Sequence, residues 1–230
     1  MENTARLFII VIGFCFLIAF VVWIFVAFSK TRVVLENTEE AVPATKTVIG
    51  SIAAGMNLLA ALSPSYAHAA DRAAQLFPTD VDLPMLDSMV SGLLRAQNVY
   101  VIGRGAGLGA AQEVALKLKE CCALHAEAYS VSEVLHGPLQ LVTKPLTVLI
   151  LDTEEAATQD SLDRAEARFT QSGSDVYRLR TSDFGVANLA PAAAAALLIY
   201  ALYPTIKNTA VALGYNPDAP DTLAKVTVTV

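Results

Sequence analysis

The chain has 230 residues, and its 22 acidic residues against 16 basic residues give a net charge of −6. This length suits one large domain, or one domain with appendages. An acidic chain without a basic stripe is a poor candidate for binding nucleic acid, so no nucleic-acid partner is expected.

Residues 7–28 form an uninterrupted apolar stretch, LFIIVIGFCFLIAFVVWIFVAF. A helix needs roughly 20 such residues to cross the hydrocarbon core of a membrane. The alternatives are a cleaved signal peptide and a buried core helix, but no small-x-small cleavage site follows the stretch directly. The pattern predicts a transmembrane helix within residues 1–30. Lys30 and Arg32 favour a membrane-anchored chain whose carboxyl-terminal part is cytoplasmic.

Four further elements are expected before residue 98. Thr31–Leu35 is a short strand candidate, and Ala44–Leu62 has helical composition and periodicity. A Ser-Pro-Ser sequence ends that helix. Two more helices are predicted at residues 66–75 and 85–96, joined by a connection that contains prolines.

From residue 99 onward, strand patterns alternate with helix patterns. Such alternation implies right-handed crossovers and a parallel sheet that is covered on both faces. The sequence therefore predicts a three-layer α/β/α domain, followed by an irregular tail at residues 214–230. The expected strands are 99–103, 126–130, 145–151 and 175–179, and the expected helices are 105–124, 154–171 and 191–213.

A glycine-rich segment, VIGRGAGLGAA, joins the first of these strands to its helix. Its Gly105-x-Gly107-x-x-Ala110 pattern fits a loose dinucleotide-binding fingerprint, and Glu127 lies near the end of the next strand. A single fingerprint of this kind is weak, because the same glycines suit a tight turn and close packing of a helix on a strand. Both interpretations remain open from spacing alone.

Glu120 and His136 are candidates for chemistry in the segment that follows. Lys117 and Glu120 lie on one face of the predicted helix, either as a plain surface pair or as part of a site. Ser130 and Glu133 are spaced as a capping box for a new helix. That helix would end at His136-Gly-Pro, where a histidine could face a pocket or satisfy a structural role.

Lys225 stands alone among the apolar residues of the tail, NPDAPDTLAKVTVTV. A lysine in a partly desolvated loop more easily presents a neutral amine that attacks a carbonyl. The alternative is an exposed tail lysine without a chemical role.

The three cysteines indicate no metal site and no disulfide framework. Cys121 and Cys122 are adjacent on a predicted helix, so their side chains point about 100° apart and would make a poor metal pair. We expect free thiols, and no metal or other cofactor.

Several separate motifs occur together in a characteristic order: ALKLKE, LHAEAY, SEVLHGPLQLV, NPDAP and LAKVTVTV. Over about Leu93–Val230 the chain resembles the isomerase half of glutamine–fructose-6-phosphate aminotransferase. It is equally similar to the glucosamine-6-phosphate deaminases, which are built from two sugar-isomerase (SIS) subdomains. A second segment, ENTEEAVPATKTVIGSIAAGMNLLAAL at Glu36–Leu62, resembles the last part of the first SIS subdomain.

The resemblance implies a fold and a division of the chain. The expected fold is a three-layer α/β/α SIS domain with a parallel sheet, preceded by the transmembrane helix. The expected parts are a transmembrane helix at 1–30, a remnant of the first SIS subdomain at 31–65, linker helices at 66–98, and a second SIS domain with its tail at 99–230.

The resemblance also implies roles for five residues. Glu120 would move a proton between C1 and C2 of an open-chain sugar phosphate. His136 would assist ring opening, and in such enzymes a partner subunit can supply it, which points to a homodimer. Lys225 would form an imine with the ketose, and the backbone at Val42 and Ala224 would line the sugar. No metal or nicotinamide is needed, and the glycine fingerprint becomes a packing turn.

The sequence departs from the family pattern in several places. The Ser/Thr-rich loop that holds the sugar phosphate in the family has no counterpart here, Ala44 stands where the pattern has serine, and no amidotransferase domain is present. One expectation is therefore an amino-sugar-phosphate isomerase or deaminase module that depends on another chain for the phosphate loop. The alternatives are a membrane-tethered, non-catalytic sugar-phosphate-binding or regulatory module, and a truncated or rearranged gene product.

Overall fold

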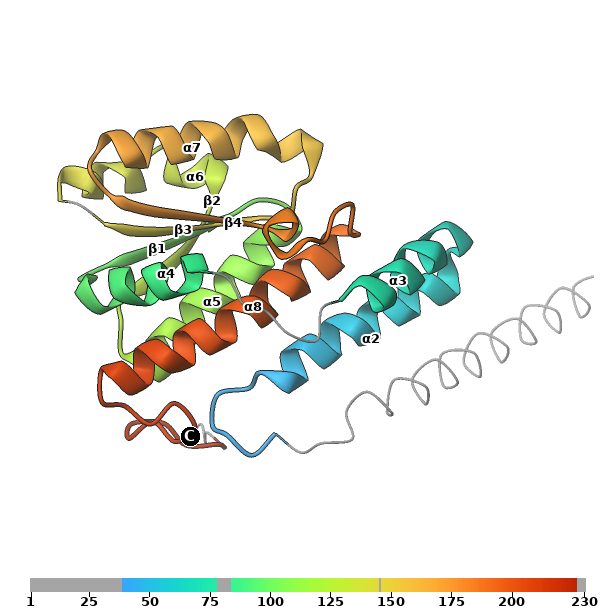
Figure 1. Ribbon diagram of the computed structural model, residues 1–230, viewed down its shortest axis with the longest axis horizontal. Helices are drawn as coiled ribbons and strands as arrows, with labels where there is room; N and C mark the ends of the chain where they lie inside the picture. The colour runs from blue at the N-terminus through green and yellow to red at the C-terminus, as the bar shows by residue number, and fades with distance from the viewer. Residues whose placement is uncertain (1–38, 78–83, 145, 227–230) are drawn as a thin grey trace, which may run out of the picture.

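The computed structural model describes residues 39–77, 84–144 and 146–226, and a parallel four-stranded sheet lies at its centre (Figure 1). The strand order is β2-β1-β3-β4, and each neighbouring pair is parallel. The central strands β1 and β3 are buried along their whole length, as expected for a sheet that is covered on both faces. The strands are β1 (Val99–Gly103), β2 (Ala126–Ser130), β3 (Thr147–Asp152) and β4 (Asp175–Arg180).

Helices cover both faces of this sheet. In Figure 1, α6 and α7 lie on one face, and α4, α5 and α8 lie on the other. The helices are α2 (Lys46–Leu62), α3 (Pro64–Leu76), α4 (Pro84–Arg95), α5 (Ala106–Cys122), α6 (Val131–Val134), α7 (Gln159–Gln171) and α8 (Pro191–Ala212). The helices α2 and α3 form a hairpin, and α2 packs on α8. The predicted three-layer α/β/α architecture is confirmed.

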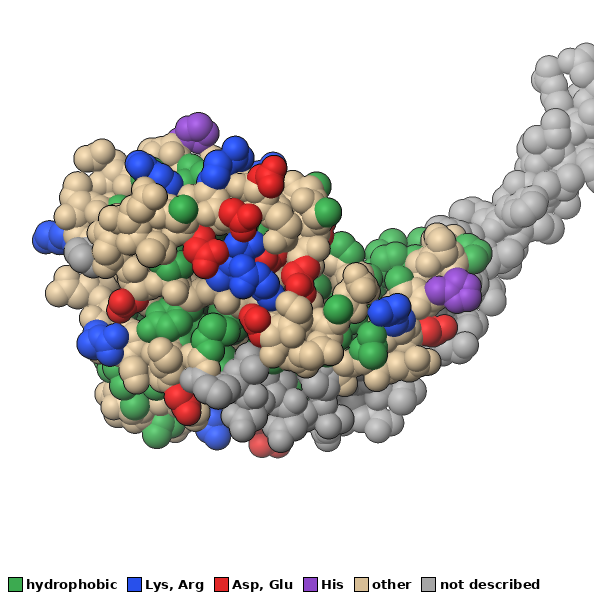
Figure 2. Space-filling view, turned by 45° about the horizontal axis from the view of Figure 1, so that its top comes forward, with side chains coloured by type: hydrophobic (Ala, Val, Ile, Leu, Met, Phe, Trp, Pro, Cys, Tyr) green, Lys and Arg blue, Asp and Glu red, His purple; other side chains and the backbone are tan. Residues whose placement is uncertain are grey.

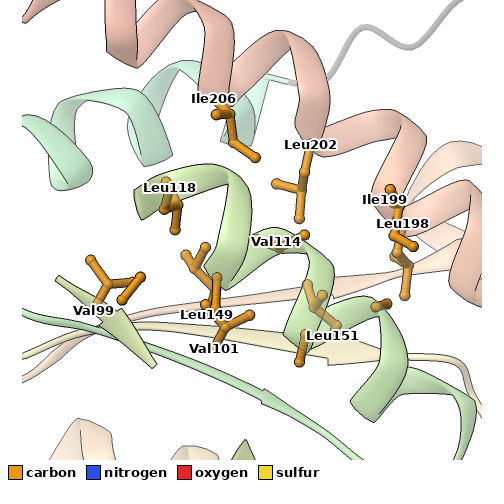
Figure 3. Close-up of a cluster of buried hydrophobic side chains, with 14 of the residues drawn as sticks. Val99, Val101, Val114, Leu118, Leu149, Leu151, Leu198, Ile199, Leu202 and Ile206 are labelled. Atoms are coloured by element: carbon orange, nitrogen blue, oxygen red, sulfur yellow. The ribbon is translucent and has the colours of Figure 1, made fainter. Parts of the chain in front are cut away.

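The larger hydrophobic core lies between the sheet and the α5–α8 pair. Figure 3 shows Val101, Leu149 and Leu151 pointing from the sheet toward Val114 of α5 and Leu202 of α8. All five side chains are almost fully buried. A second core on the opposite face joins the sheet to α6 and α7.

The glycine-rich segment brings α5 close to the sheet. A Cβ atom on Gly103 would lie 2.1 Å from the carbonyl oxygen of Gly107, and one on Gly107 would lie 2.7 Å from the carbonyl oxygen of Leu151. Gly105 has a φ of 55°, in the left-handed region that favours glycine. Close packing and a tight turn therefore account for this motif.

A buried ion cluster lies beside the carboxyl ends of β3 and β4. The guanidinium of Arg178 donates to Asp152 Oδ2 from Nε at 3.0 Å and from Nη2 at 2.7 Å. The Arg178 side chain is 2% exposed, and that of Asp152 is fully buried. Glu166 adds a further carboxylate at 2.8 Å. Figure 2 shows basic side chains surrounded by acidic ones on one face of the molecule.

The predicted fold class is corrected at the amino-terminal end, where it included a transmembrane helix. Among residues 39–77, 84–144 and 146–226, no helix is long and apolar enough to cross a membrane. Even the 22-residue α8 carries Lys207 and Asn208, and its apolar side packs into the core of the domain. The stretch 7–28 and the strand candidate 31–35 lie outside the described residues.

The predicted capping box at Ser130 is wrong. Ser130 precedes α6, but its side chain makes no capping hydrogen bond. Instead, Arg104 Nη1 donates to Ser130 Oγ at 3.1 Å and to Ser132 Oγ at 2.5 Å. The helix that follows, α6, extends over four residues.

We predict that Arg178→Ala lowers the free energy of unfolding by about 3–5 kcal/mol, because the buried Asp152 would lose both of its short hydrogen bonds to the guanidinium and keep, among the described residues, only Arg180 at 3.6 Å as a positively charged partner. The matched control is Arg95→Ala. Arg95 pairs with Asp175 at 3.4 Å, with side chains 65% and 54% exposed, so its loss is expected to cost less than about 1 kcal/mol. Urea unfolding measures both values. Equal losses in the two variants would contradict the prediction.

Candidate active site

A chain of four polar side chains connects α8 to the carboxyl-terminal half of α5. Lys117 Nζ donates to Glu120 Oε2 at 2.7 Å and lies 3.4 Å from Glu113 Oε1. The hydroxyl of Tyr203, on α8, donates to Glu113 Oε1 at 3.0 Å. The three charges share one helical face because residues three, four and seven positions apart align on an α-helix.

The three charged side chains of this polar chain differ in burial, and Lys117 in the middle is the most buried. The Glu120 side chain is 24% exposed, that of Glu113 is 12% exposed, and that of Lys117 is 4% exposed. A buried ammonium needs charged partners, and Lys117 has two carboxylates within ion-pair distance. Among these three charged side chains, Glu120 is thus the most accessible to a ligand.

The tail is tied to the loop that precedes α2. The amide of Val42 donates to the carbonyl oxygen of Asp218 at 2.8 Å, and Lys225 Nζ donates to the carbonyl oxygen of Ala41 at 2.5 Å. These two hydrogen bonds join segments that lie more than 170 positions apart in the sequence. Residues 39–45 and 214–226 therefore form one wall beside α5.

Glu39 fixes this loop to the start of α2. Its Oε2 accepts hydrogen bonds from the amides of Thr45 at 2.9 Å and Thr47 at 2.8 Å. Burial alone raises the pKa of Glu39, but the hydrogen bonds from Thr47 and Thr45 together outweigh it and hold the pKa below its usual value. A carboxylate at a helix amino terminus also has a favourable interaction with the helix dipole.

Two cavities meet at Cys121. One has a volume of about 610 Å³ and lies among the loop, α2, α5 and α8, with Lys117 and Tyr203 in its wall. The other has a volume of about 400 Å³ and lies between α5 and the tail, with Glu120 in its wall. Cys121 lines both, and the Lys117–Glu120 ion pair joins one wall to the other.

The five residues predicted to form the site are only partly brought together. Glu120 lines the 400 Å³ cavity with tail residues 215–216 and 220–223. Val42 and Lys225 lie where the loop meets the tail, and Ala224 is exposed next to Lys225. Lys225 is exposed, and not partly desolvated as the sequence predicted.

His136 lies apart from the other four residues. It is exposed and follows α6, which packs on the face of the sheet opposite α5 (Figure 1). Within one chain, the described structure therefore does not place His136 beside Glu120.

Sequence reasoning missed two members of the polar chain. Glu113 lies four residues before Lys117 on α5, so helical periodicity contained the signal for it. Tyr203 lies 90 positions from Glu113, and no local pattern connects the two. Within the described part of the chain, no group of three or more His, Cys, Asp or Glu side chains is placed to hold a metal ion.

The fold of residues 92–177 is of the sugar-isomerase class. Residues 92–177 match the family model of the SIS domain, and this part of the chain is a member of that family. The family expected from the sequence motifs is confirmed.

Several curated relatives of the chain are named glutamine–fructose-6-phosphate aminotransferase (isomerizing). The chain is 32% identical over 206 residues to the glutamine–fructose-6-phosphate aminotransferase (isomerizing) of Sulfurisphaera tokodaii, a match that covers 84% of this chain and 33% of the relative. The chain thus spans about a third of the length of that curated relative.

Two solved structures share the fold. The glucosamine-6-phosphate deaminase of Thermotoga maritima superposes with a TM-score of 0.64 at 22% identity, covering 84% of this chain and 60% of the deaminase. The carboxyl-terminal domain of the Francisella tularensis glucosamine–fructose-6-phosphate aminotransferase gives a TM-score of 0.57 at 20% identity, covering 80% and 58% of the two chains. At these identities the likeness is one of fold.

We predict that the thiol of Cys121 reacts slowly in the folded protein. Burial is the largest influence on this thiol and raises its pKa to about 11, although the nearby Lys117 charge opposes the shift. At pH 8 the thiolate fraction, and with it the alkylation rate, should be about a hundredfold lower than for an ordinary cysteine. Iodoacetamide labelling followed by peptide mass spectrometry measures the rate, with the urea-unfolded chain as the control. Equal rates in the folded and unfolded chain would show the prediction to be wrong.

Proposed function

We propose that this chain binds a sugar phosphate of the glucosamine-6-phosphate or fructose-6-phosphate class and interconverts its aldose and ketose forms. The observation that carries the proposal is the cavity that Glu120 shares with the tail, beside the buried Lys117. The names of the relatives support the substrate class, since they include both of these sugar phosphates.

Glu120 suits proton transfer between two carbon atoms. Its Oε2 is held by Lys117, and within the described residues no group donates to Oε1. That oxygen would remove the proton from C2 of the open-chain aldose, and the same carboxyl group would then deliver it to C1. The proton of the C2 hydroxyl would pass to O1, so that the carbonyl group moves from C1 to C2. The Lys117 ammonium keeps a positive charge beside the carboxylate throughout.

Lys225 would supply the second reactive group. Its amine would attack the carbonyl carbon of the ketose, and water would leave to give an imine. The hydrogen bond from Lys225 to the carbonyl oxygen of Ala41 keeps the amine at the loop–tail wall. Ligand binding would have to release that contact before the amine could react.

Because His136 is exposed and lies away from Glu120, we propose that it acts in the site of a second copy of the chain. On the opposite face of the sheet from α5, this side chain is free to enter the site of a partner subunit and open the sugar ring. We therefore include a homodimer in the proposal.

A second candidate function is sugar-phosphate binding without turnover. The observation that favours it is the separation of His136 from Glu120 within one chain. Without a group for ring opening, the chain could hold its ligand but leave it unchanged.

The test combines ligand binding with proton exchange. Titration calorimetry of the full chain with glucosamine 6-phosphate and with fructose 6-phosphate measures affinity, and proton NMR in D₂O measures the loss of the C1 and C2 protons. We expect Glu120→Gln to slow the exchange by a factor of about 10²–10⁴, because a neutral amide cannot accept the proton. Affinity should change little.

Asp71→Asn is the matched control. Asp71 is an exposed carboxylate on α3, away from the residues proposed for the site, and its replacement should leave both binding and exchange unchanged. Saturable binding without exchange in the wild type would favour the binding module. A folded chain that binds neither sugar phosphate would refute both functions.

A further inference from the structure

Tyr203 is the one member of the polar chain that does not come from α5, and it is partly buried. It comes from α8, beside the core shared with α5, and its hydroxyl reaches Glu113 Oε1 at 3.0 Å. The carbonyl oxygen of Thr45 lies 3.5 Å away. Because a hydroxyl has one proton to donate, the shorter contact to Glu113 is the one it satisfies.

The Tyr203 hydroxyl remains protonated under all ordinary conditions. Burial raises the pKa of this phenol well above its usual value, and the negative charge of Glu113 raises it further. Tyr203 is therefore a permanent donor to Glu113.

Glu113 in turn decides where the Lys117 ammonium points. Lys117 has two carboxylate partners, Glu113 at 3.4 Å and Glu120 at 2.7 Å. A Glu113 oxygen that already accepts from Tyr203 is fixed in position, and the ammonium lies closer to Glu120. Without that donor, Glu113 would be free to move toward Lys117 and draw it away from Glu120.

We propose that Tyr203 is a positioning residue for Glu120, acting through Glu113 and Lys117. The hydroxyl fixes Glu113, the two carboxylates fix Lys117, and Lys117 occupies Oε2 of Glu120 so that Oε1 faces the ligand. The role in turnover rests on the proposed function, whereas the effect of Tyr203 on Lys117 does not.

The alternative is that Tyr203 only fills space between α8 and α5. Its ring is partly buried against the larger core. Phenylalanine would keep that packing and remove only the hydroxyl, so Tyr203→Phe separates the two roles. Tyr66→Phe is the matched control, since Tyr66 is a partly buried tyrosine of α3 that lies outside the polar chain.

The first measurement is independent of turnover. Limited acetylation of the full chain, followed by peptide mass spectrometry, gives the reactivity of Lys117 relative to the exposed Lys119 on the same helix. In Tyr203→Phe we expect Lys117 to react about 3 to 10 times more slowly, because Glu113, released from the hydroxyl, would pair more closely with the ammonium. This factor is in the range for one ordinary net hydrogen bond. Tyr66→Phe should leave the ratio unchanged. Unchanged reactivity of Lys117 in Tyr203→Phe would overturn the proposal.

The second measurement uses the exchange of the C1 and C2 protons. Tyr203→Phe should lower kcat by about tenfold and change KM by less than about twofold, because the ligand still binds but the base is misplaced. A rise in KM with kcat preserved would also overturn the proposal. If the wild type itself shows no exchange, the proposed function fails. The reactivity of Lys117 alone then decides whether Tyr203 positions Glu113 and Lys117.

Discussion

Helix α5 packs against the sheet on one side and against α8 on another, and this double contact positions the charged residues that α5 contributes to the candidate site. The glycines of the first turn allow the approach, since a Cβ atom on Gly103 would lie 2.1 Å from the backbone of Gly107. Val114 and Leu118 then fill the space above the sheet (Figure 3). Because an α-helix repeats every 3.6 residues, fixing these side chains also fixes Glu113, Lys117 and Glu120 at the edge of the core.

Two clusters in this domain contain a buried positive charge. In both, carboxylates around that charge compensate for the loss of water. Arg178 is surrounded by carboxylates at the carboxyl end of the sheet, and Lys117 by two carboxylates at the other end of α5. A buried charge is tolerated only when its partners are well placed. The cluster around Arg178 joins β3 and β4 to α7. In the cluster around Lys117, Glu120 lines a cavity, so this cluster can contact a ligand.

Local sequence patterns predicted most elements closely, and the differences have local causes. The helix expected at 154–171 begins at Gln159, because Glu154 takes a φ of 58° and residues 156–158 form a single 3₁₀ turn. The carboxylate of Glu154 accepts a hydrogen bond from the amide of Ser182, a contact that no local pattern reveals. Ser130 likewise fitted a capping motif, but Arg104 engages its hydroxyl instead.

The sequence by itself determined the alternation of strands and helices, the parallel sheet and the family, because periodicity and short motifs are properties of neighbouring residues. It also singled out Glu120 and Lys117, which share one helical face. Only the tertiary structure decided that Tyr203 lies beside Glu113, that the tail closes on the loop before α2, and that His136 lies on the far side of the sheet. The contact of Tyr203 with Glu113 joins residues 90 positions apart, and that of Lys225 with Ala41 joins residues 184 positions apart. They follow from the packing of whole elements on the sheet, which no local pattern encodes.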